Sequence, residues 1–136
     1  MQTCPVCMWS SKINSLTSKF IMSITKNMYS STFIFAKKQF DEEFHRLDQA
    51  ISLAAKNTPG YLGEEAWENT TTGLVSNVYY WESLEALQAL VQHPKHLEAK
   101  AAQANWLDGY QVVISQVIKT YGDSKLGALP TSRISG

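Results

Sequence analysis

The sequence lacks a long apolar run, an excess of either charge and all but two cysteines. Lys12, Lys19 and Lys26 interrupt the only region that could suggest a membrane span, which needs roughly 18 apolar residues. The 12 basic side chains balance the 12 acidic ones, so no summed field would hold a nucleic acid or an anionic membrane. We therefore expect a soluble, cytoplasmic protein with neither nucleic acid nor membrane as a partner.

Motifs for several common enzyme and metal sites are also absent. The chain has no GxSxG nucleophile elbow, no phosphate-binding glycine loop and no HExxH zinc motif. The histidines, His45, His93 and His96, do not share the i and i+4 spacing of a helical metal pair. Cys4 and Cys7 lack the further pair that a zinc site needs, and we favour two thiols in a tail over a redox motif. The sequence predicts no hydrolase, no kinase and no metal site.

Composition divides the chain into three parts. Residues 1–30 contain no acidic residue and many serines and lysines, and we interpret them as a flexible N-terminal tail. An organellar transit peptide is the alternative for this segment. Residues 31–123 hold the periodic patterns of one domain, and a chain with 44% apolar residues can build one core. Residues 124–136 carry Gly, Ser, Pro and Thr without periodicity and are expected to form a disordered C-terminal tail.

Hydrophobic periodicity between the tails predicts an α+β domain. Strands are expected where β-branched and aromatic residues cluster, and helices where apolar residues recur at three- and four-residue spacing. The expected strands are 31–38, 61–68, 74–81 and 110–120, and the expected helices begin at Asp41, after Ser83 and at Pro94, the last running to about Trp106. This is the ferredoxin-like βαββαβ order, a four-stranded antiparallel sheet with helices on one face. The other face would be apolar and uncovered, so we expect two sheets to pair in a homodimer.

Several segments of this domain carry a resemblance to a known family. They are 79–87 (YYWESLEAL), 96–99 (HLEA), 109–110 (GY) and 121–123 (YGD), with the turn 59–63 (PGYLG) upstream. Residues 31–123 thus resemble the antibiotic biosynthesis monooxygenase (ABM) superfamily. The resemblance implies a dimeric α/β barrel with a pocket between each sheet and its helices, and functions that vary among members.

Three residues of the strand 74–81 are candidates for a pocket wall. Asn77, Tyr79 and Trp81 share strand parity, so an amide among aromatic rings could orient a planar phenolic or quinone-like ligand. The resemblance implies substrate contact for Asn77 and Trp81, because cofactor-free ABM monooxygenases have similar Asn and Trp positions in their pocket. The alternatives are a core position for Trp81 and a backbone-bonded strand position for Asn77. Tyr110 is a further candidate for substrate binding, with core or dimer packing as its alternative.

His96 is the candidate catalytic base. It follows Pro94 where the ABM motif places a histidine, and its ordinary pKa suits a proton acceptor from a phenol. The alternative is a ring nitrogen that caps or joins a neighbouring backbone group.

The resemblance implies a monooxygenase that oxidises a small aromatic or quinol-like molecule with O₂. No metal or organic cofactor is needed, because an easily oxidised phenolate can itself give an electron to O₂ if the pocket stabilises the anion. The alternative is a non-catalytic small-ligand-binding or stress-associated dimer of the same fold. The haem-degrading branch of the superfamily is disfavoured, because the strand 31–38 lacks the asparagine that this branch uses.

Overall fold

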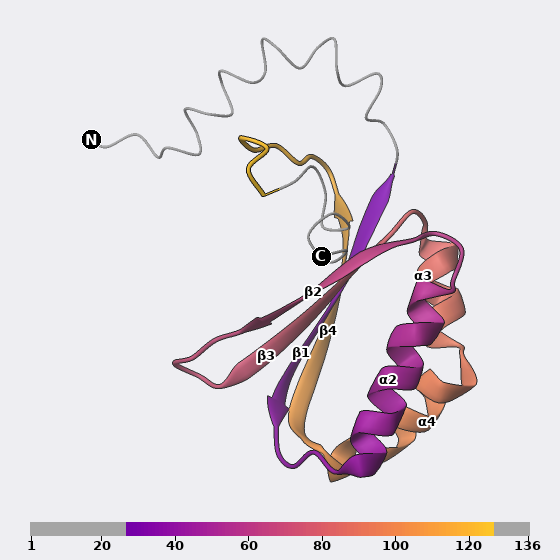
Figure 1. The fold of residues 1–136 in the computed structure, drawn as a ribbon, viewed down its shortest axis with the longest axis vertical. Helices are drawn as coiled ribbons and strands as arrows, with labels where there is room; N and C mark the ends of the chain where they lie inside the picture. The colour runs from indigo at the N-terminus through magenta and orange to yellow at the C-terminus, as the bar shows by residue number, and fades with distance from the viewer. Residues whose placement is uncertain (1–26, 127–136) are drawn as a thin grey trace.

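The computed structural model describes residues 27–126, which form one antiparallel sheet with helices on one face (Figure 1). The elements are β1 (Met28–Lys37), α2 (Glu42–Lys56), β2 (Tyr61–Glu68), β3 (Leu74–Trp81), α3 (Leu84–Val91), α4 (Pro94–Ala102), the 3₁₀ turn η1 (Gln103–Asn105) and β4 (Leu107–Val117). The predicted α+β, ferredoxin-like arrangement is confirmed. Residues 1–26, which include Cys4 and Cys7, and residues 127–136 lie outside the described part, so the tails stay predictions there.

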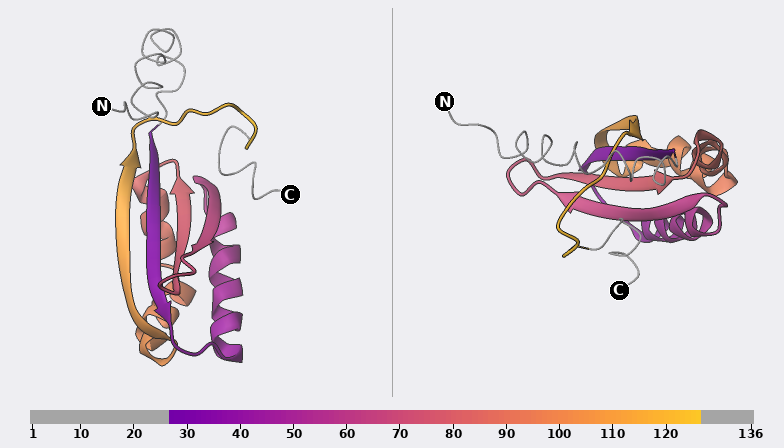
Figure 2. Two further views of the ribbon diagram at one scale, coloured as in Figure 1. Left: turned by 90° about the vertical axis from the view of Figure 1, so that its left-hand side faces the viewer. Right: turned by 90° about the horizontal axis from the view of Figure 1, so that it is seen from above.

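The strand order β2-β3-β1-β4 places β1 in the middle of the sheet and β4 at one edge. Ser31 lies opposite Tyr79 of β3 and Ile114 of β4, and Phe33 lies opposite Asn77 and Val112. Side chains alternate along a strand, so this row of residues shares the face that the helices cover. The two layers are seen edge-on in Figure 1, and in the left view of Figure 2 the sheet faces the viewer, with α2 beside β2 and the other helices behind the sheet.

Side-chain caps start the first two helices. An Asp41 carboxylate oxygen, Oδ1, accepts a hydrogen bond from the Phe44 backbone N–H at 2.9 Å, and Ser83 Oγ accepts one from Ala86 at 3.1 Å. Each cap satisfies a backbone donor that the first helical turn leaves free. The turn between α2 and β2 needs Gly60, whose φ is +96° and whose missing Cβ would lie 2.7 Å from the Ala86 Cβ. These contacts fix where α2 and α3 sit over the sheet.

Three element boundaries differ from those expected from the sequence. Strand β1 begins at Met28, not at residue 31, because Tyr29 pairs with Trp81 and packs against the core around it. Helix α4 ends at Ala102, and the tighter η1 turn replaces the expected helix up to Trp106. Strand β4 spans 107–117 instead of 110–120, because Leu107 pairs with Lys37 across an irregularity in the ladder. Residues 28–30 therefore belong to the domain and not to a tail.

Two buried clusters form the core between sheet and helices. One gathers Ala55, Trp81, Ala86, Leu87 and Leu90 beneath α3, and the other gathers Phe35, Leu47, Trp106 and Leu107 where β1, α2 and the start of β4 meet. Two separate clusters leave room between them, and that room becomes the cavity described below. Within residues 27–126, no helix has the length and apolar character that a membrane crossing requires.

The opposite face of the sheet has no helix over it in the described part of the chain (Figure 2). The register places Ile34, Val78, Trp67 and Val113 on this face. Trp67 is 61% exposed and Val113 is 40% exposed. We call this surface the outer sheet face.

Candidate functional site

A cavity of about 470 Å³ lies between the sheet and the helical layer. This volume is within the range of roughly 300–1,000 Å³ that small-molecule sites occupy. The sheet contributes the side chains of Ser31, Phe33, Phe35, Asn77, Tyr79, Tyr110, Val112 and Ile114. The helices contribute Phe44, Leu47, Asp48 and Ile51 from α2, Leu87, Gln88, Leu90 and Val91 from α3, and His96, Ala99 and Lys100 from α4. Most of these side chains are apolar.

The wall on the edge strand β4 is open to solvent. Tyr110, Val112 and Ile114 line the cavity and are 45%, 51% and 55% exposed. The row continues inward through Phe33, whose ring centroid is 5.6 Å from that of Tyr110. The β4 side therefore forms the mouth of the cavity, and the middle of the sheet forms its floor.

Four of the predicted site residues, Asn77, Tyr79, His96 and Tyr110, line this cavity, but Trp81 does not. Trp81 is 0% exposed because Ala55, Ala86 and Leu87 close over the end of β3.

Trp81 instead supports the cavity wall from beneath. Its ring stacks on that of Tyr79 with centroids 6.1 Å apart, and its Nε1–H donates to Ser31 Oγ at 3.2 Å. Both Tyr79 and Ser31 face the cavity. Trp81 therefore lies behind the residues that line the cavity, and a role for it in ligand binding stays a prediction.

His96 sits in the first turn of α4, where the preceding loop and α3 surround it. Burial lowers its pKa, and the positive charge of Lys100 and a smaller effect of His93 lower it further. A hydrogen bond to the Val91 backbone raises the pKa. Its Nδ1 is buried and has no hydrogen-bond partner among residues 27–126. A histidine in this state is neutral near pH 7 and can accept a proton, with hydrogen-bonding capacity that the described residues leave unused.

Tyr79 is held neutral at the other side of the cavity. Burial raises the pKa of its phenol, and the negative Glu64, to which it is hydrogen-bonded, raises it further. The same carboxylate accepts a hydrogen bond from Ser52 Oγ at 3.2 Å and lies 3.9 Å from Lys56 Nζ. Burial, with a smaller contribution from Glu64, also raises the pKa of the neighbouring Tyr61 to about 12. Tyr79 therefore acts as a fixed polar group and not as a base.

The structure adds two charged side chains that the sequence analysis did not place in the site. Asp48 on α2 and Lys100 on α4 both line the cavity. Burial raises the pKa of the Asp48 carboxyl, Glu64 raises it further and His45 opposes the shift. Solvent still reaches Asp48, so the carboxyl is crowded by protein atoms on one side and open on the other. One signal in the sequence was available: Asp48 lies between Leu47 and Ile51 on the apolar side of its helix.

A metal centre is not indicated in the part of the chain that the structure describes. No group of three or more His, Cys, Asp or Glu side chains within residues 27–126 is arranged to hold an ion.

Comparison with known proteins gives a match in fold and none in sequence. No family model matches the chain, and no curated protein sequence matches it either. Among solved structures, SnoaB, a cofactor-independent oxygenase from Streptomyces nogalater, has a TM-score of 0.58 at 13% identity and covers 69% of this chain and 96% of its own. A protein of Nitrosomonas europaea, provisionally described as an antibiotic biosynthesis monooxygenase, has a TM-score of 0.57 at 14% identity, with 70% and 94% covered.

A third similar structure is titled a dimeric protein of unknown function with a ferredoxin-like fold, from Bacteroides fragilis. Its TM-score is 0.50 at 15% identity, and the match covers 66% of this chain and 96% of that one. Each match covers nearly the whole of the other protein. The described domain therefore shares the fold of these proteins.

Proposed function

We propose that this protein is an ABM-type monooxygenase that oxidises a small aromatic or quinol-like substrate with O₂, without a metal or organic cofactor. The observation that carries the proposal is His96, a neutral base with an unpartnered ring nitrogen in the wall of a largely apolar cavity. The shared fold with SnoaB, whose title names it a cofactor-independent oxygenase, supports the same conclusion.

The chemistry asks the protein for orientation and proton transfer. A phenolic or anthrone-like substrate would lie on Phe33 and Tyr79, with the amide of Asn77 orienting an oxygen on its ring system. His96 would accept the acidic proton, and the resulting anion would pass one electron to O₂ to give a radical and superoxide. These two recombine to a peroxide anion, which takes back the proton from His96 to give a hydroperoxide. The hydroperoxide loses water to leave a new carbonyl group, so that one oxygen atom enters the product and the other leaves as water. Apolar walls favour this route because they exclude competing water.

Oxygen consumption by the metal-stripped protein tests the proposal. Phenols, hydroquinones and 1,8-dihydroxyanthrone would be offered to the wild type, to His96→Ala and to His45→Ala. His45 is an exposed histidine that does not line the cavity, so it is the matched control. We expect His96→Ala to lower turnover by roughly 10²- to 10⁴-fold, the usual contribution of a general base, with ligand binding retained. No oxygen uptake with any substrate, or equal loss in both variants, would contradict the enzyme assignment.

The second candidate function is a non-catalytic dimer that holds a small apolar ligand or takes part in a stress response. The predominance of apolar side chains over polar ones in the cavity favours it, since such a wall binds without reacting. It predicts that aromatic ligands bind to the wild type with no oxygen uptake.

We also propose that the outer sheet face is the interface of a homodimer. Trp67 and Val113 are exposed on a sheet face that no described helix covers, and the similar protein from Bacteroides fragilis is titled dimeric. Burying such a surface against its own copy is a frequent solution for a one-sided sheet. A cytoplasmic location stays a prediction that cell fractionation would test.

A further inference from the structure

We propose that the cavity selects a planar aromatic ligand with two different polar ends, an ionised oxygen directed to Lys100 and a hydroxyl group directed to Asp48 and Tyr79. The inference rests on the proposed function because it concerns the same cavity. The inference concerns ligand binding and not turnover, so the ligand proposal and the proposed oxygenase activity can be refuted separately.

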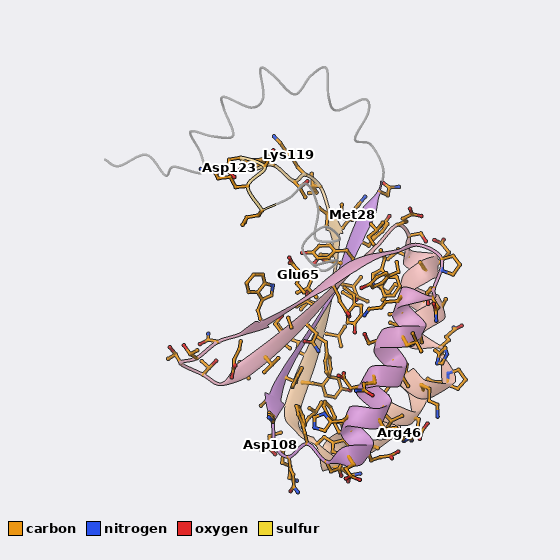
Figure 3. All side chains as sticks on the ribbon, in the orientation of Figure 1. Met28, Arg46, Glu65, Asp108, Lys119 and Asp123 are labelled. Carbon is orange, nitrogen blue, oxygen red and sulfur yellow. The ribbon has the colours of Figure 1, made fainter. Side chains whose placement is uncertain are left out.

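Lys100 supplies a positive charge that the protein does not neutralise. It lies one helical turn after His96, and both side chains line the cavity. The other cations of α2 and α4 each lie near a carboxylate. Lys95 Nζ lies 3.4 Å from a Glu98 oxygen, Arg46 Nη2 lies 3.3 Å from the other, and Lys56 Nζ lies 3.9 Å from a Glu64 oxygen. Arg46 is labelled on α2 in Figure 3. Lys100 makes no hydrogen bond or ion pair with any residue in the range 27–126. Lys100 is exposed, so water solvates its charge at the border of the cavity, and an anionic ligand group would take the place of that water.

Asp48 and Tyr79 supply hydrogen-bond acceptors at the other end. The Tyr79 hydroxyl donates its proton to Glu64, so its oxygen can only accept from a ligand. Ser52 also donates a hydrogen bond to Glu64, and Lys56 forms an ion pair with it. The Asp48 carboxyl receives no hydrogen bond from the described residues, although it lines the cavity. A ligand hydroxyl group could donate a hydrogen bond to the Asp48 carboxyl or to the Tyr79 oxygen.

The two ends lie on different helices that border one largely apolar cavity. Asp48 belongs to α2, beside β2 and β3, whereas Lys100 belongs to α4, the helix that continues into β4 (Figure 1). Phe33, Leu47 and Leu90 are among the apolar side chains of the same cavity. A fused bicyclic ring is a rigid aromatic frame that can present polar groups at its two ends.

Calorimetric titration with three matched probes tests the proposal. They are 6-hydroxy-2-naphthoate, 6-methoxy-2-naphthoate, which lacks the donor, and 2-naphthol, which lacks the anion. We expect the hydroxy acid to bind the wild type roughly tenfold more tightly than either analogue, which is the effect of one charge-assisted hydrogen bond. Lys100→Met should remove the preference over 2-naphthol, whereas Lys95→Met on the outer side of the same helix should retain it. Asp48→Leu should remove the preference over the methoxy acid, whereas Gln49→Leu should retain it.

Equal affinity of the wild type for the three probes, or no binding of any, would overturn the proposal. Equal effects of Lys100→Met and Lys95→Met would overturn it as well, since the charge would then act only at long range. Oxygen uptake is measured separately. A probe preference without oxygen uptake would contradict the proposed oxygenase activity and support the ligand proposal. Oxidation of an uncharged substrate without a probe preference would support the oxygenase activity and contradict the ligand proposal.

Discussion

Replacing Asp41 with alanine should remove two contacts made by one oxygen atom. Asp41 Oδ1 accepts from the Phe44 backbone N–H at 2.9 Å, which caps α2, and from the Trp106 Nε1–H at 3.0 Å, which ties the start of β4 to that helix. Loss of an N-cap costs about 1 kcal/mol, and an unpaired buried indole N–H adds about 1–3 kcal/mol. Because Asp41 is exposed and water can replace part of both bonds, we expect a loss of about 2–3 kcal/mol in the free energy of unfolding.

Urea unfolding followed by circular dichroism measures this loss at a fixed protein concentration. Ser83→Ala is the control, because Ser83 caps α3 through a single bond and its loss should cost only about 1 kcal/mol. Asp41→Asn keeps an acceptor oxygen at the same place and should recover most of the stability. The reasoning fails if Asp41→Ala costs no more than Ser83→Ala, or if it costs the same in a Trp106→Phe background, where the indole donor is already absent.

Three further predictions concern the site, the fold and the assembly. The pKa of His96 is lowered from 6.5 in the folded protein, so the unfolded chain binds a proton at His96 more readily. The free energy of unfolding should therefore be highest above about pH 6.5 and decline as the pH falls. Urea unfolding should show a flatter pH profile for His96→Gln than for the wild type. Gly60→Ala should lower the melting temperature more than Gly73→Ala: both glycines have positive φ, but only Gly60 would place a Cβ 2.7 Å from a neighbour. Trp67→Ser should weaken self-association in sedimentation equilibrium, and a monomeric wild type at micromolar concentration would contradict the dimer.

Much of the fold could be predicted because its signals are local. The bounds of β2, β3 and α3 follow from the turn at Pro59 and Gly60, from the polar loop between the strands and from the Ser83 cap. The misplaced boundaries depend on tertiary contacts. Tyr29 joins β1 only because Trp81 lies opposite it, and β4 begins at Leu107 because β1 continues to Lys37 beyond the ladder irregularity.

The candidate site was only partly predictable, for a related reason. Strand parity tells which face a side chain points to, and it grouped Asn77, Tyr79 and Trp81 on the same face. Strand parity does not predict how deeply a side chain is buried. The packing of α3 over the end of β3 buries Trp81, whereas Asn77 reaches the cavity. Asp48 and Lys100 are charged residues on helices, a pattern that usually indicates a solvated surface. Both are indeed exposed, and only the packing of α2 and α4 places them at the border of one cavity.

The open β4 wall has a consequence for how this protein could change over evolutionary time. Tyr110, Val112 and Ile114 touch the cavity, yet none of them belongs to either buried core cluster. Substitutions at these positions can therefore reshape the space offered to a ligand at little expense to the stability of the domain. The residues proposed to bind or react with a ligand on α2, β3 and α4 would be left in place. Libraries that vary these three residues alone are a direct route to altered ligand preference on an unchanged scaffold.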